Sequence, residues 1–486
     1  MGLAVARDIA VRGHSVCLVE REDAFAAGAS SGNSGLGCTG YDAPPGSLER
    51  RLLRRSIQLH PNLMRSMGLS YDHVVKCGSL VVAWTPAQLA KLPGVLAENV
   101  DAGDTEAEML TREELHDLEP ALAPSALGAV LCPREAVVEP WLVPLAFAES
   151  ARLHGADLRL GTEAVRCERA THGGAYWRVV TRASAAAQSG RSERGALLVR
   201  NADADADADA NTEGGGERII TARCVINCAG LFGDVVETFR DERANDFTVT
   251  PRKGQFVVFA PKGKAKDDGN DDDDDGMPSF IIEPVATEFT KGVIIWKTVY
   301  GNVIVGPTAV PQQSRGNRST DAATIARLRA YGAERIPALK DADVVGTYSG
   351  LRPATEHRDY QITARPDDAW ITVGGIRSTG LTCAPAIGEY VGELFAALLA
   401  GDPEGGVNAC SHAAAASEAA TVGVTEAASN PVALPRPPRV GNGTVPPLGV
   451  LAADYAKRGD GTVILWGRPH RVTHCISSFG MESCPG

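Results

Sequence analysis

Glu20 directly follows a short apolar run, and this position indicates a particular chemistry for its carboxylate. In a βαβ unit that binds a dinucleotide, an acid at the end of the second strand accepts hydrogen bonds from ribose hydroxyls. Residues 16–19 (VCLV) have the composition of a buried strand, and residues 2–11 place apolar side chains at helical spacing. Gly13 stands between them, where a helix would end. The spacing therefore predicts a ribose-binding role for Glu20; the alternative is a surface acid before a turn.

The glycines of this unit are mostly missing from the sequence. Dinucleotide-binding units begin with an apolar strand and a G-x-G-x-x-G turn, which lets the backbone approach a pyrophosphate. Gly2 occupies the position of the third glycine. We therefore expect the strand and the first two glycines to lie upstream of Met1.

Two further segments offer backbone N–H groups to a ligand. Residues 30–35 (SSGNSG) form a loop of small residues that can follow phosphates closely. Residues 374–382 (GGIRSTGLT) lead directly into a helix, whose N-terminus carries free N–H groups and a partial positive charge. Such a terminus suits a reduced flavin, which develops negative charge at its pyrimidine end. The alternatives are an ordinary flexible loop and a plain strand–helix turn.

The elements that must position these segments form an α/β pattern. Thr111 and Glu114 have the spacing of a capping box at the start of one short helix. Helices are expected over 48–67, 111–119, 141–155, 320–336 and 384–400. Strands are expected over 158–182, 196–199, 218–228, 247–260, 279–283, 293–297, 303–305 and 370–375, the middle ones in a mostly antiparallel sheet. Residues 401–445 have the composition of a linker, and residues 448–482 that of a small strand-rich tail.

The composition of the chain excludes several classes of protein. The chain has 486 residues, 44% of them hydrophobic, and no run of 18 apolar residues, so we expect a soluble globular protein without a transmembrane segment. Most of the net charge of −12 lies in two stretches: four Asp and two Glu in 201–217, and seven Asp against three Lys in 262–275. We expect solvated insertions there and no nucleic-acid partner. The 11 Cys include no C-x-x-C pair, so reduced thiols are expected and no metal site.

Taken together, the motifs resemble the FAD-dependent oxidoreductases of the D-amino-acid-oxidase superfamily. More narrowly, the chain is similar to the group of glycerol-3-phosphate dehydrogenases/oxidases and L-2-hydroxyglutarate dehydrogenases. The resemblance runs from residue 2 to about residue 400. Its carriers are GLAVARDIAVRGHSVCLVERE, SSGNSG, GYDAPPGSL, KCGSLVVAW, REAVVEPW, NCAGLFGD, PRKGQF, VGPTA, SGLRPATEHRDYQI and GGIRSTGLTCAPAIGEYV.

The resemblance implies an enzyme with two kinds of domain. A Rossmann-like FAD-binding domain, without its N-terminal strand, would consist of residues 1–47, 135–240 and 345–400. A substrate domain built on a mostly antiparallel β-sheet would consist of residues 48–134 and 241–344. The linker would then span 401–447, and the tail 448–486.

It also implies which residues hold FAD. Gly2 would lie near the pyrophosphate, and Glu20, with Arg21 beside it, at the adenosine ribose. The backbone of Val165 would face the adenine. The remaining cofactor contacts would be Ser31, Asn33 and Ser34 along the pyrophosphate and flavin, Ala229 and Gly230 packed on the cofactor, and Gly375, Gly380, Leu381 and Thr382 around the flavin pyrimidine and ribityl chain.

Substrate contacts follow from the same resemblance. Arg352 is the expected anion anchor, because a planar guanidinium binds a carboxylate or phosphate with two parallel hydrogen bonds. Lys253 and Ser378 would be second polar contacts near the flavin. The alternative for Arg352 is an ion pair with Glu356 or Asp359, and for Lys253 a surface charge on a hairpin.

Cys38 departs from the relatives, which carry a His at this position. That His would take the hydroxyl proton as hydride leaves the substrate carbon, and a thiol is a poorer base near neutral pH. The expected reaction is oxidation of the CH–OH carbon of glycerol 3-phosphate or a 2-hydroxy acid, with oxygen, a quinone or another carrier as acceptor. Amine oxidation, a binding protein without FAD, and an NAD(P) enzyme are the alternatives, the last disfavoured by the flavin-type segment 374–382. The expected location is cytoplasmic or mitochondrial.

Overall fold

The structure is a computed structural model that describes residues 1–69, 73–170, 176–185, 212–213, 216–243, 246–261, 276–286, 292–401 and 445–483. The expected strand over 196–199, the acidic stretch 262–275 and most of the acidic stretch 201–217 lie outside these residues, as does most of the expected linker.

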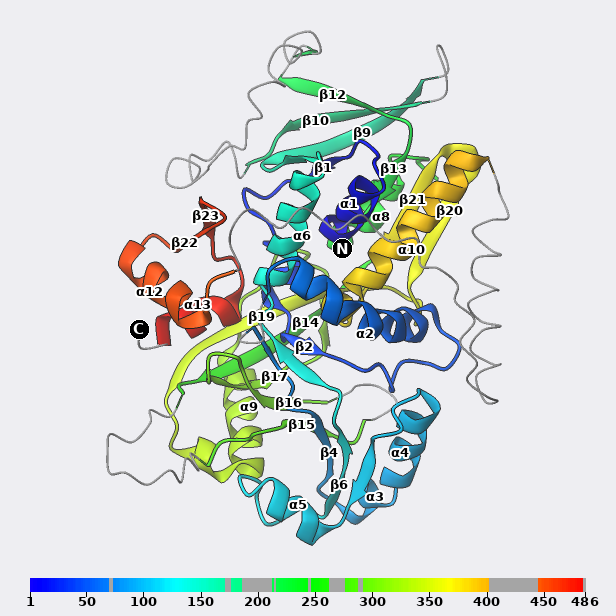
Figure 1. The fold of residues 1–486 in the computed structure, drawn as a ribbon. Helices are drawn as coiled ribbons and strands as arrows, with labels where there is room; N and C mark the ends of the chain where they lie inside the picture. The colour runs from blue at the N-terminus through cyan, green and yellow to red at the C-terminus, as the bar shows by residue number, and fades with distance from the viewer. Residues whose placement is uncertain are drawn as a thin grey trace.

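A large mixed sheet fills the lower half of the molecule in Figure 1. Its strands run in the order β18-β14-β17-β16-β15-β4-β6-β5, and β19 pairs with β14. Every recorded pairing is antiparallel except that of β15 with β4, which confirms the expectation of a mostly antiparallel sheet. The strands are β4 (Ser79–Ala83), β5 (Glu108–Leu110), β6 (Gly128–Cys132), β14 (Thr250–Phe259), β15 (Ile281–Pro284), β16 (Ile294–Lys297), β17 (Val303–Gly306), β18 (Val310–Pro311) and β19 (Val344–Ala354).

Helices cover this sheet. A core of buried side chains joins the sheet to α5 and α9, with Leu115, Val257 and Leu328 among its members. The capping box of Thr111 and Glu114 at the start of α5 is present as expected, because the two side chains each accept a hydrogen bond from the other's backbone N–H. The helices are α3 (Pro86–Leu89), α4 (Leu92–Asp101), α5 (Arg112–Leu118) and α9 (Ala322–Arg335), with the 3-10 turn η5 (Pro337–Lys340) after the last.

The parallel strands form two separate small sheets in the upper half of the molecule. β1 (Cys17–Val19) pairs with β8 (Asp157–Arg159), and β13 (Val225–Asn227) pairs with β21 (Trp370–Gly374), which also pairs antiparallel with β20 (Gln361–Arg365). The first turn of α1 (Gly2–Val11) lies against both, because a Cβ at Gly2 would be 3.5 Å from Cys228 and 3.6 Å from Leu18. In the part of the chain that the structure describes, no strand joins β1 to β13. The strand expected upstream of Met1 stays a prediction.

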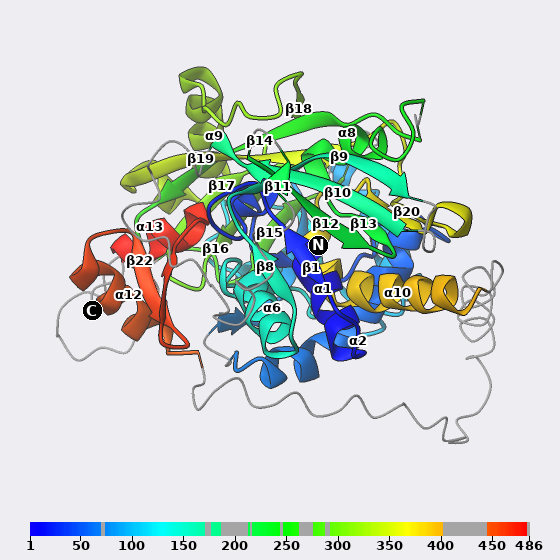
Figure 2. The ribbon, with the colours of Figure 1, turned by 90° about the horizontal axis from the view of Figure 1, so that it is seen from above.

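Helices pack around these parallel strands, as the view from above shows (Figure 2). α1 contacts α6 (Leu142–Leu153) and α10 (Gly380–Ala400), and α10 contacts α2 (Leu48–Ser66). α10 begins four residues earlier than expected, so Gly380, Leu381 and Thr382 lie in its first turn. It is the one helix among the described residues with the length and hydropathy of a membrane span, and half of its apolar window is buried inside the protein.

Smaller elements complete the fold. The sheet of β11 (Thr212–Glu213), β12 (Glu217–Ala222), β10 (Tyr176–Ala183) and β9 (Thr162–Ala170) lies at the top of Figure 1. β2 (Leu36–Gly37), β7 (Ala136–Val138) and β3 (Val74–Val75) pair below α2. The 3-10 turns η1 (Ala29–Gly32), η4 (Gly230–Phe232) and η6 (Pro366–Asp368) and the short helix α8 (Gly233–Glu237) connect these parts.

The tail is not strand-rich, which corrects the expectation. It consists of α12 (Leu448–Arg458), a hairpin of β22 (Thr462–Leu465) and β23 (Arg468–Arg471), and α13 (Cys475–Ser483). α13 forms because Ile476, Gly480 and Met481 are buried against distant parts of the chain, and a local pattern does not show such contacts.

Candidate cofactor and substrate site

A cavity of about 2200 Å³ lies between the parallel strands, the large sheet and the first turn of α10. Ordinary small-molecule sites have volumes of about 300–1,000 Å³, so this cavity has room for a dinucleotide together with a substrate. Its walls come from α1, β1, η1, β13, β14, β19 and α10. Sequence segments far apart in the chain, those predicted to do chemistry among them, therefore meet at one space.

Glu20 and Arg21 line the end of the cavity formed by β1. Oε1 of Glu20 accepts a hydrogen bond from the N–H of Glu22 at 3.0 Å. Burial raises the pKa of this carboxyl. The Arg21 guanidinium lies 3.8 Å from the centre of the Phe232 ring. Gly230, two residues before Phe232, has a φ of +54° and lines the cavity with Ala229. This end of the cavity therefore offers the Glu20 carboxylate to a ribose, and the exposed backbone of Ala229 and Gly230 as a surface on which a cofactor can pack.

The loop around η1 is held against the large sheet by a close backbone contact. A Cβ on Gly350 would overlap the carbonyl oxygen of Gly32, and a Cβ on Gly32 would lie 2.7 Å from Cα of Gly350. Arg318 also fixes the loop, because it donates to the Ala27 carbonyl at 2.8 Å and to Ser31 Oγ at 2.9 Å. Only residues without a side chain permit this approach.

The predicted loop contacts differ in their placement. Asn33 and Ser34 line the cavity, whereas Ser31 is buried behind it and donates to the Gly28 carbonyl at 2.9 Å. The Asn33 side chain shapes the turn, since it accepts the N–H of Gly35 at 2.7 Å and donates to the Ser30 carbonyl at 2.9 Å. Ser31 therefore supports the loop through Arg318.

The first turn of α10 points its free N–H groups at the cavity. Thr379 makes no side-chain cap; its hydroxyl instead donates to Glu49 Oε1 at 2.7 Å. Gly375, with a φ of +68°, Ser378, Gly380 and Leu381 line the cavity. The uncapped amides and the helix dipole give this wall a partial positive charge, which suits an anionic ring or phosphate.

Thr382 connects this turn to the loop that carries Cys38. Its Oγ1 accepts the N–H of Cys38 at 3.1 Å and lies 3.4 Å from the Leu36 carbonyl oxygen. Cys38 lines the cavity beside this junction. Thr382 thus positions the predicted flavin-facing loop and is not itself a lining residue.

Arg352 presents a half-buried positive charge to the cavity. Its guanidinium donates to the Thr308 carbonyl at 3.2 Å, and burial together with the nearby Arg252 lowers its pKa to about 10. No carboxylate pairs with it among the described residues. The two alternative partners are engaged elsewhere, because Glu356 accepts the N–H of Thr248 and Asp359 accepts N–H groups at the start of α2.

Lys253 points away from the cavity. Its Nζ donates to Ser319 O at 3.0 Å and Asn317 Oδ1 at 3.3 Å, on the other face of β14. Alternate residues of β14 face the cavity, and these are Thr250, Arg252, Gly254 and Phe256. Since side chains alternate along a strand, Arg252 and not Lys253 lies beside Arg352. This placement corrects the expected contact at Lys253.

The adenine contact predicted at Val165 falls on a β-bulge. The register of β9 with β10 shifts between Arg166 and Ala164, which leaves Val165 without an opposite residue. Ala164 and Cys167 line the cavity, and Val165 does not. A bulge frees backbone N–H and C=O groups, so the predicted backbone contact stays a prediction at this position.

Sequence reasoning missed several residues of the site. The alternation within PRKGQF signals that Arg252 and Gly254 share one face. The other missed residues, for which no local signal exists, are Arg318 and Gly350, which contact the predicted loop 30–35.

The donors present fit FAD. The cavity combines a carboxylate after β1, an uncapped helix N-terminus and a loop of small residues, which match a ribose, a flavin pyrimidine and a pyrophosphate. Across the described residues, no group of three or more His, Cys, Asp or Glu side chains is placed to hold a metal ion.

Comparison with known proteins identifies relatives that are FAD-dependent oxidoreductases. Residues 1–394 match the family model described as FAD dependent oxidoreductase. The chain is 25% identical to a glycerol 3-phosphate dehydrogenase from Caloramator mitchellensis over 392 residues, which is 80% of this chain and 71% of that protein. The solved L-alpha-glycerophosphate oxidase from Mycoplasma pneumoniae with FAD bound has a TM-score of 0.63 and 22% identity, over 82% of this chain and 92% of that one. A glycine oxidase from Bacillus cereus also has a TM-score of 0.63, with 20% identity, over 82% of this chain and 94% of that one.

Proposed function

The chain belongs to the family of FAD-dependent oxidoreductases, and on this premise we propose that it oxidises the CH–OH carbon of a small anionic substrate, glycerol 3-phosphate or a 2-hydroxy acid. The observation that carries the proposal is the half-buried guanidinium of Arg352 in the cavity wall, without a carboxylate partner among the described residues. A partly desolvated charge without a partner is costly, and an anionic ligand would offset that cost.

The charges of the site favour a substrate with two negative charges. Arg252 and Arg352 are directly opposite each other in the β14–β19 pairing, and both line the cavity. A phosphate or a dicarboxylate can meet both guanidiniums, whereas a single carboxylate meets one well. Glycerol 3-phosphate is the substrate for which the relative from C. mitchellensis is named, and this agrees with the charge argument.

FAD, when bound, supplies the acceptor for the hydride. The C–H and O–H bonds of the substrate would break and a carbonyl would form, with the proton passing to solvent or to Cys38 as its thiolate. Arg352 and Arg252 would orient the substrate by its anionic end, and the first turn of α10 would stabilise negative charge that develops on the cofactor side. Glu20 would hold the ribose, which fixes the cofactor relative to these groups. Oxygen, a quinone or another carrier would then reoxidise the cofactor.

Amine or amino-acid oxidation is the second candidate, and the residue at position 38 favours it. A CH–OH substrate needs a base for its hydroxyl proton, and this wall presents the thiol of Cys38 where the family resemblance implies a His. An amine substrate with an unprotonated nitrogen needs no such base.

Anaerobic reduction of bound flavin by a substrate panel tests the proposal. The purified full-length chain should be yellow, and glycerol 3-phosphate or a 2-hydroxy acid should bleach its absorbance. Bleaching by glycine or N-methyl amino acids alone would support the second candidate. A folded protein without flavin, even after incubation with FAD, would overturn both and support a binding protein without the cofactor.

A further inference from the structure

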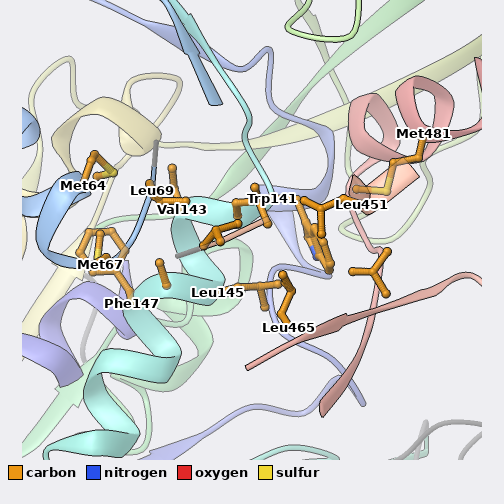
Figure 3. Close-up of a cluster of buried hydrophobic side chains, with 14 of the residues drawn as sticks. Met64, Met67, Leu69, Trp141, Val143, Leu145, Phe147, Leu451, Leu465 and Met481 are labelled. Carbon is orange, nitrogen blue, oxygen red and sulfur yellow. The ribbon is translucent and has the colours of Figure 1, made fainter. Parts of the chain in front are cut away.

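The C-terminal segment 445–483 lies beyond the residues that match the family model, yet it packs against the cofactor-binding half of the molecule. Figure 3 shows Leu451, Leu465 and Met481 of this segment beside Trp141 and Leu145, at the start of α6. All five side chains are nearly fully buried. The segment is therefore part of the core and not a loose appendage.

A buried carboxylate, that of Glu139, also holds the C-terminal segment in place. Glu139 is completely buried; it accepts the N–H groups of Trp141 and Leu142 at 2.9 and 2.6 Å and the hydroxyl of Tyr300 at 3.3 Å. Ser477 of α13 donates its hydroxyl to the same carboxyl. The carboxyl thus joins α13 to α6 and to the loop after β16.

Close packing anchors α13 further. A Cβ on Gly480 would overlap the ring of Tyr300, and the ring of Phe479 lies where a Cβ on Gly346 of β19 would stand. Two glycines on opposite sides of the contact therefore permit it. α13 is therefore packed closely against β19 of the large sheet and against Tyr300.

The end of β23 and the residues that join it to α13 reach the loop that follows β1. Arg471 forms a two-pronged ion pair with Asp23, with N–O distances of 2.8 and 2.5 Å. Thr473 Oγ1 donates to the Phe25 carbonyl at 2.9 Å. The Asp23 carboxylate is 15% exposed and the Arg471 side chain 43%. Both contacts fall on the stretch between Glu20 and η1.

That stretch borders the cavity, and Arg318 holds its far end through the Ala27 carbonyl at 2.8 Å. Phe25, Ala26 and Gly28 line the cavity. No helix or strand is assigned between β1 and η1, and Ala26 adopts a left-handed φ of +56°. A non-glycine residue holds that conformation only when its surroundings impose it.

We propose that the C-terminal segment is a positioning element of the cofactor site: Arg471 and Thr473 hold residues 23–28 in the shape that borders the cavity, so FAD affinity depends on a part of the chain outside the family's common core. The inference uses the FAD site of the family and does not depend on which substrate is oxidised.

Amide hydrogen exchange of the full-length protein, without added FAD, tests the loop directly. In Arg471→Gln, the amides of residues 23–31 should exchange about two- to fivefold faster, the range expected for loss of one partly exposed ion pair. The matched control is Arg458→Gln, because among the described residues Arg458 bonds Thr462 and Asp460, both within the segment itself. The control should leave the loop at the wild-type rate.

A charge swap and a binding titration complete the test. The double variant Asp23→Arg with Arg471→Asp should restore slow exchange, which a general loosening of the segment would not allow. Titration of apo-protein with FAD, followed by flavin fluorescence, should give a dissociation constant about two- to fivefold higher for Arg471→Gln, in line with the same ion-pair range. Equal loop exchange in Arg471→Gln and Arg458→Gln, or faster exchange with unchanged FAD affinity, would overturn the inference. Wild-type protein that binds no FAD at all would contradict the proposed function, while the exchange data would still decide the role of the segment.

Discussion

Arg252 and Arg352 are directly opposite each other across the β14–β19 pairing, and Gly254 makes the arrangement possible. A Cβ on Gly254 would lie 2.9 Å from Nη2 of Arg352. The missing side chain gives the Arg352 guanidinium room to lie against β14. Like charges at this spacing repel each other, so the pair is better suited to binding an anion than to stabilising the fold.

Replacement of Arg352 should damage substrate binding and spare the cofactor. A hydrogen bond to a charged group contributes about 1.5–3 kcal/mol, so Arg352→Ala should raise KM about 10- to 150-fold while FAD content stays at the wild-type level. Arg252 is more exposed, and Arg252→Ala should raise KM only about two- to fivefold. Steady-state kinetics together with the flavin-to-protein absorbance ratio measure both effects. An unchanged KM in Arg352→Ala would remove the anchor role.

The pKa of Arg352 predicts how substrate binding varies with pH. Burial lowers this pKa to about 10, so the guanidinium is charged at neutral pH and loses its proton as pH rises through about 10. The charged form binds the anion; KM should therefore be flat below this pKa and rise about tenfold per pH unit well above it. Steady-state kinetics between pH 8 and 11 would show the rise, and Arg352→Ala should lack it. A flat profile in the wild type would mean that the substrate does not depend on this charge.

The sequence predicted those parts of the site that depend on local pattern. The strand before Glu20 and the helix after residues 374–382 follow from spacing, hydropathy and turn residues, and the structure contains both, the helix beginning at Gly380 and not at residue 384. The local pattern did not predict that Arg252 rather than Lys253 lines the cavity, because this depends on which face of β14 is turned to the cavity. That face is set by pairing with β19, about a hundred residues further along the chain.

Long-range contacts account for the rest. The helix over 475–483 depends on burial against Tyr300 and Gly346, and the loop around η1 depends on Arg318. None of these partners is near its contact in sequence, so a local pattern carries no signal for them. The resemblance also ends near residue 400 and gave no expectation for the segment that follows.

Gly350 should be essential for the shape of the cofactor loop. A Cβ at this position would overlap the carbonyl oxygen of Gly32, so Gly350→Ala must push η1 away from β19. Overpacking of this kind costs about 1–3 kcal/mol, and we expect a similar loss of folding stability and at least a tenfold loss of FAD affinity. Thermal unfolding and FAD titration measure the two effects.

Gly316→Ala is the matched control for this substitution, since no heavy atom lies within 4 Å of a Cβ at that position. It should leave both stability and FAD affinity unchanged. Wild-type FAD affinity in Gly350→Ala would show that the loop around η1 does not need this contact to bind the cofactor.

Substitution of Cys38 should distinguish between the two candidate substrate classes, hydroxy compounds and amines. Its side chain borders the cavity, and its N–H is fixed by Thr382 at 3.1 Å, so a replacement would occupy the same place. A well-placed general base contributes about 10²–10⁴-fold, and an imidazole introduced without other changes should give less, so we expect Cys38→His to speed flavin reduction by hydroxy substrates about tenfold. Cys38→Ser, which adds no base near neutral pH, should leave that rate unchanged. Anaerobic stopped-flow absorbance measures all three proteins. If Cys38→Ser lowered the rate a hundredfold instead, the thiol itself would be the proton acceptor, and the case for an amine substrate would lose its main support.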